Sequence, residues 1–229
     1  MSPFAQSSLA ERRAAARIAS DRVIAASLPL YVLAEQHPTR DQPGCIEIGC
    51  WKEGEAEGVM AYVSPLDAMI DLYSRNRDGG QYQIFPFEAV DPRALIKSHD
   101  GWLTVYLVYG FSARGNRFLL NGRGEPIPLT LGTHFQIDID AADQVHLQFS
   151  DKLLTWLDRL HQKARIPDHG RVAQEQSEGS ATELDRLAQD ALLRIAGIDA
   201  AAPAITHCGI FDPIERCWRF VSFAELEGA

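Results

Sequence analysis

Residues 59–119 alternate between strand and helix patterns, and this alternation limits what the chain can fold into. In order, the stretch predicts a strand, a helix, a strand, a short helix and two further strands. Its clearest local signal is the segment from Ser64 to Asp67. Ser64 can accept a hydrogen bond from an orphan backbone N–H, Pro65 suits the first helical position, and Asp67 lies three residues after the cap. Because these side chains serve to begin a helix, the stretch predicts the fold and does not point to a catalytic activity.

The rest of the chain adds strands on either side of this stretch. Residues 102–109 are apolar at nearly every position, as expected for an interior strand covered on both faces. Residues 135–139 and 145–149 alternate apolar and polar side chains, which favours two strands over one long helix beginning at Asp140. The expected strands are residues 28–33, 46–51, 59–63, 82–87, 102–109, 116–120, 126–131, 135–139 and 145–149.

Several helices and a hairpin complete the predicted organisation. A capping-box pattern from Ser8 to Glu11 opens an Ala-rich stretch that favours a helix. Ser150 is expected to cap a helix through residue 164, a second amphipathic helix covers residues 183–195, and a hairpin at 205–223 turns at Asp212-Pro213. The predicted division is an N-terminal helix (1–26), a main α/β domain (27–166), a polar linker (167–181) and a C-terminal helix–hairpin module (182–229).

The predicted fold class is therefore α+β, with a central mixed or antiparallel sheet and helices packed on it. A net charge of −9 and a pI near 5.2 argue against a nucleic-acid binder, which needs clustered Lys and Arg. The same charge favours a basic protein partner if the acids share one face. No segment approaches the length of a membrane span, and the N-terminus lacks the apolar run of a signal peptide.

Four cysteines without a C-x-x-C pair are too few for a disulfide framework. We therefore expect reduced thiols, a cytoplasmic protein and no cofactor. His207 and Cys208 are neighbours, and a thiolate activated by an imidazole is a good nucleophile. Neighbours in a strand point to opposite faces, however, so a buried structural cysteine is the preferred interpretation.

Two acidic sets are the candidate binding residues. Asp138, Asp140 and Asp143 could share a hard cation, because Asp138 and Asp140 would lie on one face of a strand. The competing explanation, a solvent-facing strand residue followed by turn formers, is favoured, so no metal site is predicted. The second set, on a hairpin tip, could meet a basic partner and consists of Glu53, Glu55 and Glu57.

The pattern as a whole resembles the SseB (enhanced serine sensitivity) family. The resemblance rests on a strand that runs into a Ser-capped helix at residues 60–65, extended residues 82–87, the apolar strand 102–109 and the Asn121-Gly122 turn. At the C-terminus it rests on the helix at 183–195 and the hairpin broken at Asp212-Pro213. The resemblance implies a bacterial cytoplasmic protein with no established catalytic residues.

Catalytic signatures are missing from the sequence: it contains no phosphate-binding G-x-x-x-x-G-K-[ST], no H-E-x-x-H and no G-x-S-x-G. We therefore expect a non-catalytic protein-binding protein, such as an adaptor, a regulator or an immunity-type partner. The alternatives are a metal-dependent or Cys208-dependent enzyme and a small-molecule sensor domain. The sequence leaves open whether the chain forms a homodimer.

Overall fold

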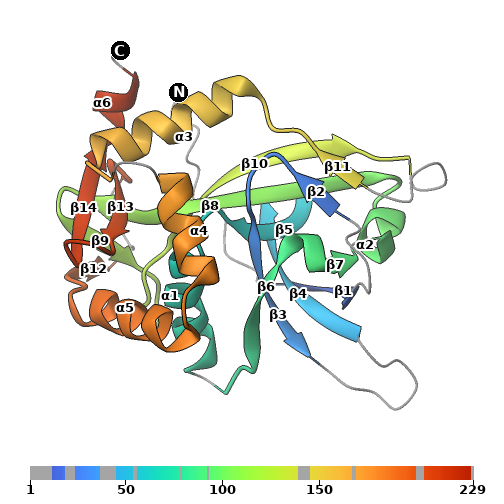
Figure 1. Ribbon diagram of the computed structural model, residues 1–229, viewed down its shortest axis with the longest axis horizontal. Helices are drawn as coiled ribbons and strands as arrows, with labels where there is room; N and C mark the ends of the chain where they lie inside the picture. Colours follow the sequence, from blue (N-terminus) through green and yellow to red (C-terminus); the bar gives the residue numbers. More distant parts are fainter. Residues whose placement is uncertain are drawn as a thin grey trace. The chain divides into compact units, whose positions relative to one another are not determined.

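The computed structural model describes residues 12–18, 24–36, 45–53, 56–77, 79–91, 93–138, 145–166, 169–199 and 204–227. The chain has the expected α+β class, with a large mixed sheet and several helices (Figure 1). It divides into two compact units that interleave along the sequence, whereas the predicted domains follow one another. Unit 1 comprises residues 1–63, 75–107 and 131–149, and unit 2 comprises 64–74, 108–130 and 150–229.

Unit 1 is built mainly from strands. Strand β3 pairs antiparallel with β4, β5 and β6, while β1 pairs antiparallel with β4 and β7. Strand β11 lies parallel to β2 in a separate two-stranded sheet. The elements of unit 1 are β1 (Arg12–Ile18), β2 (Ile24–Ala26), β3 (Tyr31–Gln36), β4 (Cys45–Glu53), β5 (Ala56–Tyr62), β6 (Tyr82–Pro86), η1 (Phe87–Ala89), β7 (Val90–Asp91), α2 (Arg93–Ser98) and β11 (Val145–Leu147).

Helix α1 (Pro65–Asn76) and strands β8 (Trp102–Arg114) and β10 (Pro128–Gln136) each contribute residues to both units. In unit 2, β13 pairs antiparallel with β8 and β14, β9 pairs antiparallel with β8, and β12 lies parallel to β9. The other elements of unit 2 are β9 (Arg117–Leu120), α3 (Asp151–Lys163), α4 (His169–Glu178), α5 (Ala181–Leu193), β12 (Gly197–Asp199), β13 (His207–Asp212), β14 (Cys217–Ser222) and α6 (Phe223–Glu227).

Helices pack on both faces of the unit 2 sheet, and Figure 1 shows β13 and β14 between α3 and α5. On one face, an aromatic cluster around Phe118 and Trp218, with ring centroids 4.5 Å apart, packs against α1 and α5. The indole of Trp218 also donates a 2.9 Å hydrogen bond to the carbonyl of Ala191. Trp156 of α3 packs edge-on against Tyr109, with ring centroids 5.0 Å apart. Unit 2 therefore has a core that holds α1 in a fixed place against the sheet.

Two predictions about secondary structure were wrong. The expected N-terminal helix of residues 1–26 is replaced by strands β1 and β2, because β1 pairs along its length with β4. Pairing with a neighbouring strand here overrides the helix preference of alanine, which is a weak local signal. The expected linker contains helix α4, because Val172 and Ala173 are buried in unit 2. The capping-box residues Ser8 to Glu11 lie outside the described residues.

A third correction concerns β10, which is one strand of residues 128–136 in place of two separate strands at 126–131 and 135–139. Gly132, which lies between the two expected strands, is part of β10 and packs against the ring of Tyr106, where an added Cβ would be 3.0 Å from the ring. The expected strand at 28–33 is shifted and forms β3 at 31–36. The strands around 46–51, 59–63, 82–87, 102–109, 116–120 and 145–149, the helices near 65–76, 151–163 and 181–193, and the C-terminal hairpin are confirmed with small shifts in their ends.

Candidate functional site

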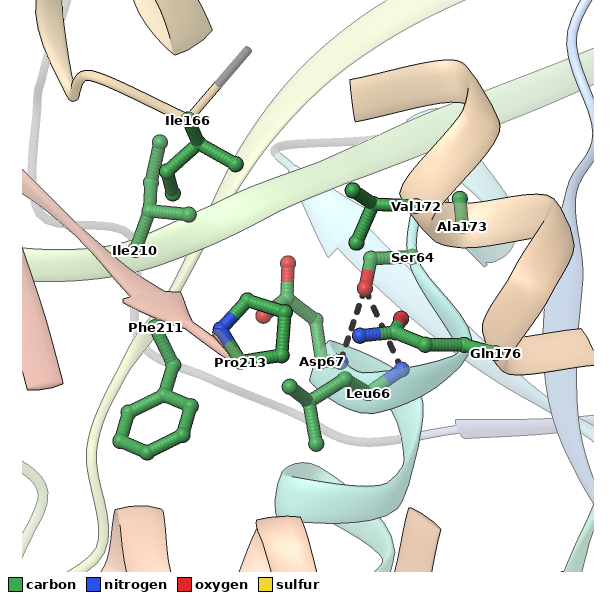
Figure 2. Close-up of a pocket in the computed structure, with 10 residues that line it drawn as sticks. All are labelled: Ser64, Leu66, Asp67, Ile166, Val172, Ala173, Gln176, Ile210, Phe211 and Pro213. Atoms are coloured by element: carbon green, nitrogen blue, oxygen red, sulfur yellow. Dashed lines mark hydrogen bonds between the residues drawn. The ribbon is translucent and has the colours of Figure 1, made fainter. Parts of the chain in front are cut away.

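A small hollow lies within unit 2 (Figure 2). Its floor is the first turn of α1, and its walls come from α4, from β13 and the turn after it, and from Ile166 in the segment after α3. Most of the walls are buried apolar side chains, and the lining residues are Ser64, Leu66, Asp67, Ile166, Val172, Ala173, Gln176, Ile210, Phe211 and Pro213. A polar floor under apolar walls is the usual composition of a binding pocket.

The local sequence explains why α1 begins at this point. The hydroxyl oxygen of Ser64 accepts hydrogen bonds from the backbone N–H groups of Leu66, at 3.2 Å, and Asp67, at 3.4 Å. The carbonyl of Ser64 accepts the first helical hydrogen bond, from the N–H of Ala68. This confirms the predicted cap, and it has a consequence for binding. Two N–H groups that could otherwise hold an anion at the helix N-terminus are already used.

Asp67 projects from this turn into the hollow (Figure 2). Its side chain is almost fully enclosed, with 4% of the residue exposed, and no described residue donates a hydrogen bond to its carboxyl group. Burial raises the pKa of Asp67 from 3.8 to about 7, because an enclosed carboxylate loses its hydration. The sequence predicted a capping role for this residue, whereas in the structure its carboxyl group faces a cavity.

The hollow is small. Its free space is close to what one water molecule needs. Counted with its part open to solvent, the whole hollow has a volume of about 300 Å³. It therefore fits one group of the size of water or ammonium.

The β13–β14 turn forms one side of the hollow through Pro213. The carboxyl oxygen of Asp212 accepts 3.0 Å hydrogen bonds from the N–H groups of Ile214 and Glu215, and Asp212 also forms a 3.1 Å ion pair with Arg219. These bonds fix the turn, as is typical when an Asp closes a turn through its own side chain. Directly after Pro213, the Ile214 residue is 66% exposed, so a fixed turn presents an apolar side chain to solvent.

Cys208 lies on β13 and does not form a nucleophilic site. It is fully buried, and burial together with the nearby charge of Asp67 raises the pKa of the thiol well above its ordinary value. His207 points elsewhere, and its Nδ1 lies 3.1 Å from the N–H of Gly115, which donates to it. The prediction that these neighbours cannot act together is consistent with this geometry, since a thiol with a raised pKa is a poor nucleophile at neutral pH.

The predicted acidic residues do not gather into a described site. Asp138 is exposed and lies beyond the end of β10, so it does not occupy the strand position that was expected. Glu57 is partly buried on β5, opposite Lys52 in the register, and Glu53 ends β4. Glu55, Asp140 and Asp143 lie outside the described residues. Within the described part of the chain, no group of three His, Cys, Asp or Glu residues could hold a metal ion.

Two further findings concern the chain as a whole. In the described residues, no helix combines the length and the apolar character required to cross a membrane. Comparison with protein-family models, with curated proteins and with solved structures finds no match to this chain.

Proposed function

We propose that this chain is a protein-binding protein without catalytic chemistry of its own, acting as an adaptor, a regulator or an immunity-type partner. The observation that carries this proposal is the exposed Ile214 on a fixed turn, one residue after Pro213, which lines the hollow. A lone exposed apolar residue needs no explanation, but one on a fixed turn that also contributes to an apolar pocket resembles the anchor region of an interface. A pre-formed turn also lowers the entropy that binding must remove.

Charge supports a basic partner. The chain carries 31 acidic and 22 basic residues, and its net charge is −9. Such a charge steers positively charged proteins toward the surface and makes association sensitive to salt. The resemblance to the SseB family fits the same proposal, because it implies a bacterial cytoplasmic protein with no established catalytic residues.

The experiment that tests the proposal is affinity capture with the full chain, followed by mass spectrometry and by measurement of the recovered complex. We expect one protein at a fixed stoichiometry, with less recovery as salt is raised. We expect Ile214→Ser to reduce recovery about fivefold or more, because anchor residues contribute more than 1 kcal/mol. A chain that stays monomeric and captures no stoichiometric partner would contradict the proposal.

A matched control is Leu193→Ser in the same unit. Leu193 ends α5 and is 85% exposed, so its replacement removes a similar apolar side chain from solvent without disturbing the core. We expect Leu193→Ser to leave capture unchanged. Equal losses for both variants would show that surface apolar area in general, and not the turn beside the hollow, drives association. Light scattering on the free chain separates a foreign partner from a second copy of the chain.

A further inference from the structure

Helix α4 covers the hollow that encloses Asp67. Val172, Ala173 and Gln176 of this helix form one wall, and the carboxyl group of Asp67 lies between that wall and the residues contributed by β13 (Figure 2). We propose that ionisation of Asp67 promotes the release of α4, so that α4 is a pH-sensitive cover that the protonated carboxyl group holds closed more firmly than the carboxylate does. The inference concerns unit 2 alone and stands independently of the proposed protein binding.

The closed hollow is too small to hydrate a carboxylate. No described residue donates a hydrogen bond to the carboxyl group of Asp67, so the ionised side chain depends on water for its donors. Its two oxygens can accept about four hydrogen bonds, whereas the hollow has room for about one water molecule. Further waters can enter only when a wall moves away. Protonation removes this demand, because a neutral carboxyl group costs far less to bury than a charged one.

The wall that is held most weakly is α4. Among the residues of α4 whose burial is described, Val172 and Ala173 are buried, Gln176 is partly buried and the others are exposed. The opposite wall, β13, is paired with both β8 and β14, and the segment with Ile166 follows a helix whose leucines are buried. The floor is fixed by Leu66, which packs into the core between α1 and the sheet. Displacement of α4 therefore exposes little apolar surface and breaks no strand pairing.

The ionisable groups around the hollow leave Asp67 as the one that titrates near neutral pH. It is the one ionisable side chain among the lining residues. Cys208 of β13 interacts with its charge, and burial raises the pKa of that thiol well above its ordinary value. Asp71, one turn further along α1, is buried as well. The charged residues directly next to lining residues in the chain are exposed or ion-paired, and they are Arg165, Arg171, Glu175 and Asp212.

The direction of the response follows from where the proton is held. Burial raises the pKa of Asp67 from 3.8 to about 7 while the hollow is closed, and hydration restores the ordinary value once α4 has moved. The open form therefore releases a proton that the closed form keeps. The open fraction grows as pH rises between these two values and levels off above the higher one. From pH 6 to pH 8, this linkage increases the open fraction by about tenfold.

Amide hydrogen exchange of the full chain, followed by NMR, tests the cover. Protection factors remove the intrinsic effect of pH on exchange, so they report the opening itself. We expect α4 to be about 100-fold or more less protected than the best-protected amides of α5, because it opens without the rest of the unit. Its protection should fall by about tenfold from pH 6 to pH 8. Asp67→Asn should abolish this fall, whereas Glu225→Gln, which removes an exposed carboxylate of unit 2, should preserve it.

A second variant tests which contact holds the cover. Val172→Ala removes two buried carbon atoms and should lower the protection of α4 by about tenfold at every pH without changing the pH response. Unchanged protection in this variant would show that α4 is not held at the hollow and would overturn the cover. A pH response that is absent from the parent chain, or that persists in Asp67→Asn, would overturn it as well. Equal protection of α4 and α5 would assign the opening to unfolding of the whole unit, which also contradicts a cover.

Discussion

Replacement of Asp67 by asparagine should make the protein more stable at neutral and alkaline pH. The pKa of this carboxyl group is about 7 in the fold and 3.8 in its ordinary state. The folded chain therefore holds a proton that the unfolded chain releases, so the free energy of unfolding falls as pH rises between these values. Each tenfold difference in proton affinity is worth about 1.4 kcal/mol, so the ionised carboxylate lowers stability by roughly 4 kcal/mol above pH 7.

Asparagine has nearly the same shape as aspartic acid and cannot ionise. Near pH 4 both side chains are neutral in the folded chain, and we expect stabilities that differ by less than about 1 kcal/mol. The difference should grow to roughly 4 kcal/mol at pH 8, and about 1.4 kcal/mol of it should appear between pH 6 and pH 8. Solubility is lowest near the pI of about 5.2, and the interval from pH 6 to pH 8 lies above it. Urea unfolding followed by tryptophan fluorescence at several pH values measures the difference.

The comparison with the parent chain is essential, because His161 opposes the effect of Asp67. This histidine is buried, its Nδ1 lies 2.8 Å from the carbonyl of Leu157, and burial lowers its pKa to about 4. Its contribution to stability is lost as pH falls below 6.5, whereas that of Asp67 is lost as pH rises. Subtracting the parent curve from the Asp67→Asn curve removes the histidine. If the difference in stability between Asp67→Asn and the parent chain does not change with pH, Asp67 does not have a raised pKa. If the variant is less stable than the parent at pH 8, the carboxylate of Asp67 has a stabilising partner.

Three further predictions follow from the same unit. Gly110→Ala should lower the free energy of unfolding by roughly 2 kcal/mol or more in urea titration. Gly110 has a φ of 142°, and an added Cβ would lie 2.7 Å from the sulfur of Cys208. The control Gly122→Ala should not lower it, because no atom lies within 4 Å of the position of an added Cβ there. In native protein at pH 7.5, iodoacetamide should label Cys217 and leave the buried Cys208 unmodified, as measured by peptide mass spectrometry. Rapid labelling of Cys208 would instead support the alternative of a cysteine-dependent enzyme. Ser180→Ala should cost about 1 kcal/mol in the same unfolding assay, since its hydroxyl caps α5 at 3.2 Å from the N–H of Glu183.

Local signals predicted the elements that are defined by short-range chemistry. The caps at Ser64, Ser150 and Ser180 begin three helices, and each hydroxyl accepts from a first-turn N–H group. Ser180 was not named as a cap from the sequence, although the helix after it was expected. The apolar run at 102–109 is an interior strand, and its burial on both faces explains why it is apolar at nearly every position and does not alternate.

Elements that depend on distant partners could not be read from the sequence. The Ala-rich segment of β1 is a strand because of its register with β4, and neither strand contains a signal for the other. Helix α4 is mostly polar, and Val172 and Ala173 are the buried apolar residues among those whose burial is described. The hollow was missed for the same reason. Its walls come from segments more than 140 residues apart, and Asp67 alone looks like an ordinary capping residue.

The carboxyl group of Asp67 is not needed to begin α1. A fold that needed only a cap would be served by Ser64, whose hydroxyl already satisfies two N–H groups, and the buried carboxylate then adds instability without a local benefit. A titration of this carboxyl group in the native chain, followed by ¹³C NMR of its side chain, measures its proton affinity directly. We expect a pKa of about 7, because burial disfavours the charged form, and a value at or below 3.8 would contradict an enclosed carboxyl group without a hydrogen-bond donor.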